Sequence, residues 1–164
     1  MAARTVRPAL ASDAPAIAAV HVQAWRETYA HLMPADFLAA LDVERRAAGW
    51  TEIIADDVTD VFVALADTEV IGWATAGAGR DPGGAGTREL EGIYLVNAAY
   101  GSGAGQQLLD AAVGNEPAHL WMADDNPRAE AFYRRNGFAR DGAEAVRSFG
   151  PVDVRLVRLT RLTR

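Results

Sequence analysis

The stretch LVNAAYGSGAGQQLL, residues 95–109, joins an apolar run to a helix-like pattern through Gly101, Gly103 and Gly105. Glycine has no Cβ, so the backbone at these positions can come very close to a ligand. Amides at the start of a helix are unpaired and carry partial positive charge, which attracts phosphate oxygens. The stretch therefore predicts a phosphate or pyrophosphate cradle, with a tight strand-to-helix turn that binds nothing as the alternative.

Two common phosphate-binding loops do not fit this stretch. A P-loop needs Gly-Lys-Ser/Thr, and the chain has no lysine, because all 16 of its basic residues are arginine. A dinucleotide-binding fingerprint needs a third glycine where Gln106 stands, and it usually follows the first strand of its unit. An x-G-x-G-x-G turn between a strand and a helix remains.

Hydrophobic periodicity predicts the secondary structure of the rest of the chain. It predicts helices over 12–32, 35–50, 103–113 and 126–138, and strands over 4–9, 60–67, 69–79, 87–96, 118–125 and 152–160. The strands 60–67 and 69–79 read as a hairpin, whereas strands separated by a helix are expected to be parallel neighbours. The order predicts a single α/β domain over residues 1–164, with a mixed sheet and helices on both faces.

Composition narrows the classes of function. The 164 residues are 50% hydrophobic, include no cysteine and carry a formal net charge of −6. The absence of cysteine excludes disulfides, thiolate metal sites and cysteine nucleophiles, and the acidic balance argues against general affinity for nucleic acid. No apolar run approaches a membrane span, and the N-terminus lacks the apolar core of a signal peptide. We expect a soluble cytoplasmic protein without a nucleic-acid or membrane partner.

A second stretch, NPRAEAFYRRNGF over residues 126–138, carries a family resemblance. It is similar at every fixed position to the pattern Asn-x-x-Ala-x-x-Phe-Tyr-x-x-x-Gly-Phe of the GNAT superfamily, the acyl-CoA-dependent N-acyltransferases. YGSGAG (100–105) resembles their Arg/Gln-x-x-Gly-x-Gly/Ala signature, except that Tyr100 occupies the usual Arg or Gln slot. HVQAWRETYAHLMP (21–34) resembles the first helices of many bacterial members, so the resemblance covers nearly the whole chain.

The resemblance implies a fold and a reaction. The expected fold is a strongly twisted, mixed sheet of six to seven strands that splays into a V, in which acyl-CoA lies. The expected reaction is transfer of an acetyl group from acetyl-CoA to a primary amine of a small molecule or peptide, directly within a ternary complex. Alternatives are a non-catalytic acyl-CoA-binding sensor or degenerate member, and a transferase of a longer acyl group. Homodimers are common in the family, although no segment here identifies a dimer interface.

The resemblance also implies which residues contact acetyl-CoA as co-substrate. These are Ile93, Tyr94, Leu95, Tyr100, Gly101, Ser102, Gly103, Ala104, Gly105, Gln106, Asn126 and Tyr133. Strand backbone would pair with the pantetheine arm, and the glycine-rich amides would hold the pyrophosphate. Tyr100 offers no charge to phosphate, so an arginine elsewhere is a candidate replacement: Arg128, Arg134 or Arg135.

Catalysis requires a proton donor for the leaving thiolate and a way to deprotonate the amine. Tyr133 is the implied donor, with a core aromatic as its alternative role. Glu89 and Glu91 lie two positions apart on their strand and therefore point to the same face. Either is a candidate base or a solvated glutamate. Trp25, Tyr29 and His31 are candidates for lining the acceptor pocket, together with the loop 80–86; aromatic residues at helical spacing are also typical of a core. The three scattered histidines form no metal motif, so no metal is expected.

Overall fold

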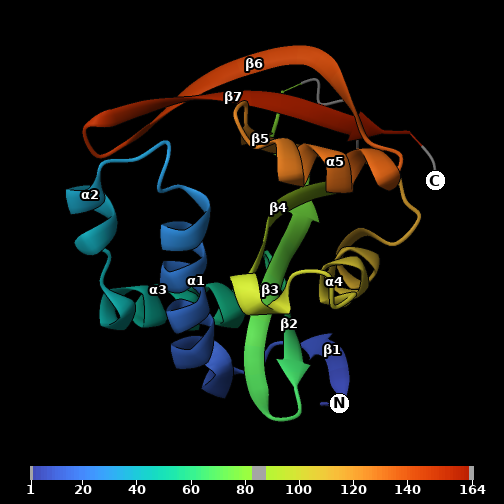
Figure 1. The fold of residues 1–164 in the computed structure, drawn as a ribbon. Helices are drawn as coiled ribbons and strands as arrows, with labels where there is room; N and C mark the ends of the chain where they lie inside the picture. Colours follow the sequence, from blue (N-terminus) through green and yellow to red (C-terminus); the bar gives the residue numbers. More distant parts are fainter. Residues whose placement is uncertain (1, 83–87, 163–164) are drawn as a thin grey trace.

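One seven-stranded sheet forms the centre of the molecule, in the order β1-β2-β3-β4-β5-β7-β6 (Figure 1). The computed structural model describes residues 2–82 and 88–162. The strands are β1 Arg4–Pro8, β2 Asp60–Ala66, β3 Glu69–Ala78, β4 Arg88–Leu95, β5 Ala118–Ala123, β6 Ala139–Phe149 and β7 Val152–Arg161. The helices are α1 Ala14–Thr28, α2 Ala35–Ala39, α3 Val43–Ala55, α4 Ala104–Val113 and α5 Pro127–Arg135, with short 3₁₀ turns η1 Ala11–Asp13 and η2 Asn97–Ala99.

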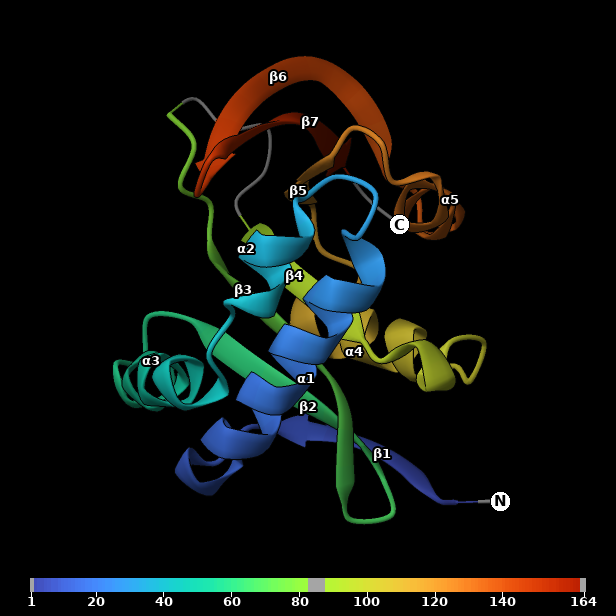
Figure 2. The same cartoon turned by 60° about the vertical axis from the view of Figure 1, so that its left-hand side comes forward.

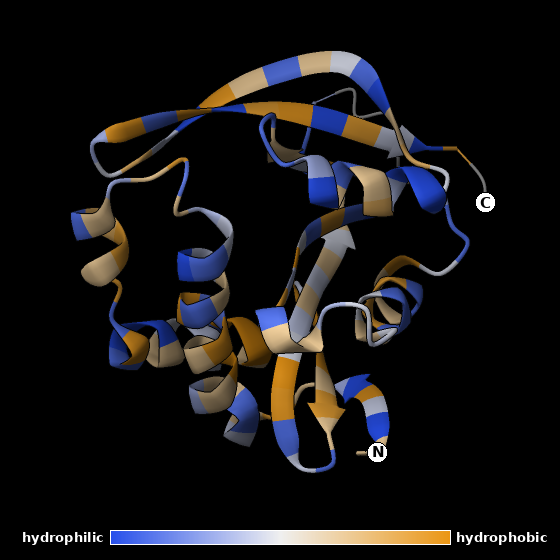
Figure 3. Ribbon diagram, viewed as in Figure 1, coloured by the Kyte–Doolittle hydropathy of each residue, from blue (hydrophilic) through white to orange (hydrophobic). Residues whose placement is uncertain are grey.

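Helices cover both faces of the sheet, as predicted. Figure 2 separates α3 on one side from α4 on the other. The α4 side buries Leu108 and Leu109 against the sheet, and the α1–α3 side buries Ile17, Trp50 and Trp73. Figure 3 shows strongly hydrophobic segments on β2 and β3, near the centre of the molecule. Within the described ranges, no helix combines the length and the apolar character that a membrane span requires.

The helices between β1 and β2 differ from the prediction. The first ends at Thr28 instead of residue 32, and the second divides into α2 and α3. The division occurs at Asp42, whose carboxylate accepts hydrogen bonds from the amides of Glu44 (2.9 Å) and Arg45 (3.2 Å). A side chain that satisfies the free amides of a first turn marks a new helix start.

The strand β6 is absent from the sequence-based prediction. It pairs with β7 in a long antiparallel hairpin that arches over one end of the molecule (Figure 1). Nearly all of its residues are exposed, so it lacks the alternation of apolar and polar positions that identifies a half-buried strand. The tip of the hairpin docks on the first helices, where the Phe149 ring lies 5.4 Å from that of Trp25.

The splay between β4 and β5 is the feature that creates a site. These are the one parallel pair of neighbours among the described strands, and their register covers Arg88–Ala118, Glu89–His119 and Leu90–Leu120. The strand β4 continues to pair with β3 as far as Leu95, whereas β5 continues along β7. The β5-facing backbone groups of residues 91–95 therefore have no strand partner in the described chain, and the two strands open into the predicted V.

Candidate active site

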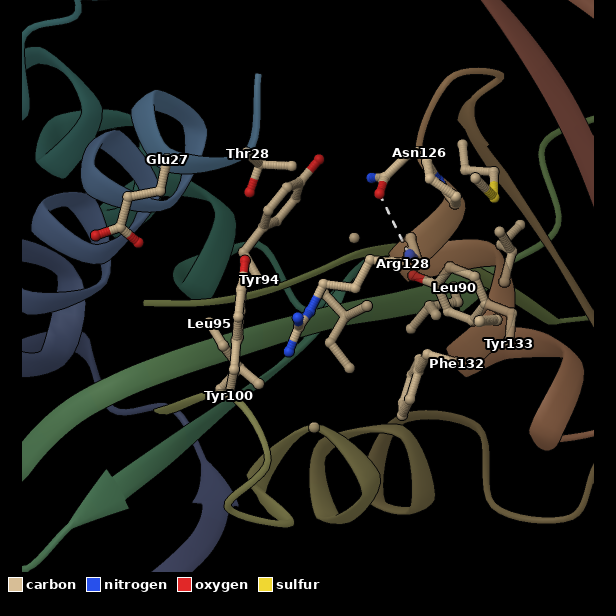
Figure 4. Close-up of a pocket in the computed structure, with 18 of the residues that line it drawn as sticks. Glu27, Thr28, Leu90, Tyr94, Leu95, Tyr100, Asn126, Arg128, Phe132 and Tyr133 are labelled. Carbon is tan, nitrogen blue, oxygen red and sulfur yellow. Dashed lines mark hydrogen bonds between the residues drawn. The ribbon is translucent and has the colours of Figure 1, made fainter. Parts of the chain in front are cut away.

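The V holds a cleft of about 910 Å³. Its walls come from β4, the turn before α4, the end of β5, the first turns of α5 and the C-terminal end of α1. Figure 4 shows side chains from these elements facing one another across the open edge of β4. The cleft thus runs between the two halves of the sheet and reaches the glycine stretch.

The glycine stretch forms a left-handed turn at the start of α4. Gly101 has φ +73° and Gly103 has φ +87°, a region that favours glycine. A Cβ at either position would meet nothing within 4 Å, so open space lies in front of the backbone. Gly105 serves another purpose, because a Cβ there would lie 3.3 Å from the Leu95 side chain. The first two glycines allow the left-handed turn, and the third lets α4 pack closely on β4.

Tyr133 lines the cleft from α5 and is 7% exposed. Its ring packs against Phe132 (5.4 Å between centroids) and Phe138 (6.0 Å). Burial raises the pKa of the phenol above its ordinary value of 10.0, and nearby Tyr29 adds to the effect. The hydroxyl is consequently protonated at neutral pH and has a proton to give.

Asn126 and Gln106 line the cleft, but each side chain already has an intramolecular partner. The Asn126 Oδ1 accepts a hydrogen bond from the Ala129 amide (3.2 Å) and caps α5. The Gln106 Nε2 donates to the Asn136 Oδ1 (2.8 Å), which ties α4 to the end of α5. These contacts fix the two helix starts on either side of the cleft.

The two candidate bases differ in their surroundings. Glu89 is 3% exposed, pairs with the Arg80 guanidinium and is not among the described residues that line the cleft. Burial would raise the pKa of Glu89, but the hydrogen bonds and charge of Arg80 outweigh it and hold the pKa below the ordinary value. Glu91 lines the cleft, and burial raises its pKa; Arg80 opposes this shift, and Glu89 reinforces it. The structure therefore brings Glu91, and not Glu89, to the cleft.

A cluster of Asp81, Glu89 and His119 lies beside this strand, with ligand-type atoms within 4.8 Å of one another. Residue spacing in the sequence did not indicate it. Each carboxylate already has a cationic partner: Arg80 pairs with Glu89, and Arg158 lies 3.2 Å from Asp81. The Trp121 Nε1 also donates to Asp81 (2.8 Å). Arg158 also pairs with Asp141 (2.6 Å), so the cluster is part of a larger ion-pair network.

The end of the cleft away from the glycine turn is lined by the C-terminal end of α1, the residues that follow it and the loop after β5. The hydroxyls of Tyr29 and Tyr94 share a hydrogen bond, and the His31 Nε2 lies 2.9 Å from the Asp125 carbonyl oxygen. Trp25 is not among the described lining residues, and it packs instead on Tyr29 and Phe149. Of the predicted acceptor loop 80–86, residues 83–86 lie outside the described residues.

Most sequence-predicted residues meet at this cleft. Those that line it are Tyr29, His31, Glu91, Ile93, Tyr94, Leu95, Tyr100, Gly101, Gly103, Gly105, Gln106, Asn126 and Tyr133. Ser102 and Ala104 do not; the Ser102 Oγ accepts a hydrogen bond from the Ala104 amide (3.3 Å) within the turn. Sequence reasoning missed Glu27, Asn97, Trp121, Asp125 and Phe132 as lining residues. The Glu27 carboxylate accepts from the Asn97 amide (2.7 Å), a contact between distant segments that no local pattern indicates.

Comparison with known proteins places the same segments in one family. Residues 57–140 match the acetyltransferase (GNAT) domain. The uncharacterized N-acetyltransferase YuaI of Bacillus subtilis is 32% identical over 130 residues, which covers 75% of this chain and 73% of that protein. The probable N-acetyltransferase Rv2775 of Mycobacterium tuberculosis is 22% identical over 151 residues, covering 84% of this chain and 80% of that protein.

Solved structures share the fold over the full chain. The PaiA N-acetyltransferase of Thermoplasma acidophilum, in complex with coenzyme A, superposes with a TM-score of 0.76 at 18% identity, covering 98% of this chain and 99% of that one. YncA of Salmonella typhimurium, a putative acetyltransferase with its cofactor acetyl-CoA, has a TM-score of 0.70 at 22% identity over 98% of this chain and 94% of that one.

Proposed function

Because this chain belongs to the GNAT superfamily of acetyltransferases, we propose that it transfers the acetyl group of acetyl-CoA to a primary amine by direct transfer in a ternary complex. One observation carries the proposal: an open glycine turn at the start of α4 adjoins the unpaired edge of β4 and a protonated Tyr133 in the same cleft. The glycine turn suits a phosphate, the unpaired edge of β4 suits an amide-rich arm, and Tyr133 can protonate a leaving thiolate.

The residues present fit acetyl-CoA. Open space lies on the Cβ side of Gly101 and Gly103, at the positive end of α4, which suits the close approach of a pyrophosphate. The β5-facing backbone groups of residues 91–95 suit a pantetheine arm, whose amides can pair with them as an added strand would. Neither interaction requires a particular side chain on β4.

Tyr133 supplies the acid in this proposal. The amine nitrogen attacks the thioester carbonyl carbon, the carbon–sulfur bond breaks, and Tyr133 gives its hydroxyl proton to the departing sulfur. A raised pKa keeps that proton in place until the thiolate forms. The chain contains no cysteine, which supports direct transfer over an acyl-cysteine intermediate.

Glu91 is favoured over Glu89 as the base. It lines the cleft with a raised pKa, which makes it a stronger proton acceptor than an ordinary carboxylate, whereas Glu89 is held by Arg80. Glu91 would take the amine proton directly or through water. The acceptor would enter from the Tyr29 and His31 end of the cleft, opposite the glycine turn.

A panel of primary amines incubated with acetyl-CoA tests the proposal through release of free CoA. A thiol reagent reports that release directly, because the protein has no thiol of its own. A reaction without amine controls for hydrolysis, and propionyl-CoA tests the acyl length. We expect acetyl-CoA to bind in calorimetry and one class of amine to accelerate release. No binding at millimolar acetyl-CoA would contradict the proposal, and binding without turnover on any amine would favour the sensor alternative.

A further inference from the structure

A cation–π contact joins the two lips of the cleft. The guanidinium carbon of Arg128 lies 3.9 Å from the centre of the Tyr100 ring. Tyr100 comes from the turn before α4, and Arg128 comes from the first turn of α5. Figure 4 shows the Arg128 side chain reaching over β4 toward that ring. Both residues line the cleft, so the arginine head is held at the entrance to the glycine turn.

The charge of Arg128 has no acidic partner among the described residues. Seven of the other arginines pair with carboxylates, whereas Arg135, which also lines the cleft, has no described ion pair. The seven are Arg7, Arg80, Arg88, Arg134, Arg140, Arg155 and Arg158. Arg128 instead faces an aromatic ring, close to amides that carry partial positive charge at the start of α4. Two sources of positive potential thus meet where Arg128 has no ion pair with a described carboxylate, an arrangement that suits an anionic ligand.

Tyr100 stands where the related signature carries arginine or glutamine. A tyrosine there cannot neutralise phosphate, but its ring face can hold a guanidinium through its negative quadrupole. Two side chains thus take the place of the single Arg or Gln of the signature: the Tyr100 ring in the turn and the Arg128 guanidinium from α5. A guanidinium so delivered keeps its N–H groups available for phosphate oxygens.

We propose that Arg128 is the cation that binds the pyrophosphate of acetyl-CoA, and that Tyr100 is a positioning residue that holds it over the Gly101–Gly105 amides. The proposal rests on the acetyl-CoA binding proposed above. Guanidinium and amides then contact the same diphosphate from two sides, and the 3′-phosphate and pantetheine arm do not depend on Arg128.

Three ligands separate the phosphates in the test: acetyl-CoA, its 3′-dephospho form and acetyl-pantetheine, which has no phosphate. Loss of a charge-assisted hydrogen bond typically weakens binding about 10- to 100-fold. In Arg128→Ala we expect that loss for the first two ligands, and an unchanged KM for acetyl-pantetheine. Arg134→Ala is the matched control, because Arg134 lies on the same helix, outside the described cleft lining, with a 60% exposed side chain. It should bind all three ligands as the wild type does.

Variants of Tyr100 test the platform. Tyr100→Phe keeps the ring and should bind acetyl-CoA normally, whereas Tyr100→Ala should bind several-fold more weakly. Adding Tyr100→Ala to Arg128→Ala should cause no further loss, because the ring acts through the arginine. If the wild type binds acetyl-CoA and Arg128→Ala binds equally well, the Arg128 proposal is wrong and the proposed function stands. A loss confined to ligands with the 3′-phosphate, or equal losses with acetyl-pantetheine, would also overturn it.

Discussion

The hydroxyls of Tyr29 and Tyr94 lie 2.8 Å apart and join the end of α1 to β4 at the wall of the cleft. Burial raises the pKa of both phenols, so the bond links two neutral groups at neutral pH. It connects an element before β2 to the strand whose open edge forms the proposed cofactor side of the V. The proposed acceptor side is therefore joined to that strand by a polar contact.

Removing either hydroxyl tests how tightly the two sides are coupled. Tyr29→Phe and Tyr94→Phe should each lower the free energy of unfolding by about 1 kcal/mol, because each leaves one phenol without its partner. The double variant should lose less than the sum of the two. Urea titrations of the four proteins measure the coupling. Strictly additive losses would mean that the contact contributes nothing to stability.

Tyr133→Phe should reduce kcat about 100-fold with little change in the affinity for acetyl-CoA. The variant keeps the ring that packs on Phe132 and Phe138 and loses only the proton donor. Steady-state kinetics and calorimetry on the same preparation separate the two effects. Phe132→Leu is a useful comparison, because it disturbs the packing and leaves the hydroxyl. Unchanged turnover in Tyr133→Phe would remove its role as the acid.

Glu91→Gln and Glu89→Gln should fail in different ways. Glu91→Gln should lower kcat about 100-fold and abolish the acidic limb of the pH–rate profile, which lies above the ordinary glutamate pKa of 4.5 because the pKa of Glu91 is raised. Glu89→Gln should retain turnover and lose about 1–2 kcal/mol of stability, because it weakens the ion pair with Arg80. The pKa of Glu89 is lowered by folding, so its contribution is present above pH 4.5 and lost in acid. The reverse pattern would make Glu89 the base.

Substitution of two different glycines by alanine should change the stability of the protein in opposite directions. Gly103→Ala places a side chain at φ +87°, which costs about 1–2 kcal/mol and turns the amide away from the cradle, so acetyl-CoA should bind more weakly. Gly49 lies inside α3 with nothing within 4 Å of an added Cβ. Gly49→Ala should raise stability by about 1 kcal/mol without changing binding. Thermal melts with and without ligand distinguish the two, and equal acetyl-CoA affinity in Gly103→Ala would argue against the cradle.

Stability should fall as the pH drops from about 6.5 to about 4, through His21. Burial, reinforced by the charge of Arg46, lowers the pKa of His21 from 6.5 to about 4, and its Nδ1 accepts a hydrogen bond from Trp50 (3.2 Å). The unfolded chain binds the proton in this interval and the folded chain does not, so acid favours unfolding by up to about 3 kcal/mol. His21→Gln keeps an acceptor for Trp50 and cannot titrate. Its stability curve should be flatter there, and a parallel curve would contradict the assignment.

The fold was largely predictable because its elements have local signals. Gly103 begins α4, Gly114 ends it, and Asn126 caps α5, so these helices lie close to their predicted bounds. The strand β6 was not predictable from hydrophobic alternation, because it is held by pairing with β7 and is solvated on most positions. The break between α2 and α3 had a signal in Asp42 that hydrophobic periodicity alone overlooks.

The lining of the cleft was predictable where a motif fixes the spacing of residues along one segment. The glycine turn and Tyr133 are such positions, since their spacing is fixed along one segment. The choice between Glu89 and Glu91 was not, because it depends on Arg80, which forms a pair with Glu89 from a separate strand end. The contact of Arg128 with Tyr100 spans two helix starts 28 positions apart, and only the folded chain brings them together.

The short seam between β4 and β5 should also couple ligand binding to the stability of the protein. Among the described residues, three pairs join the β1–β4 half of the sheet to the β5–β7–β6 half along that seam. A cofactor that fills the V would act as an inserted strand and bind only the folded chain. At 100 times its Kd, such a ligand adds about 2.7 kcal/mol of stability. We therefore expect the metabolic supply of acetyl-CoA to set how long this enzyme survives proteases, in addition to how fast it works.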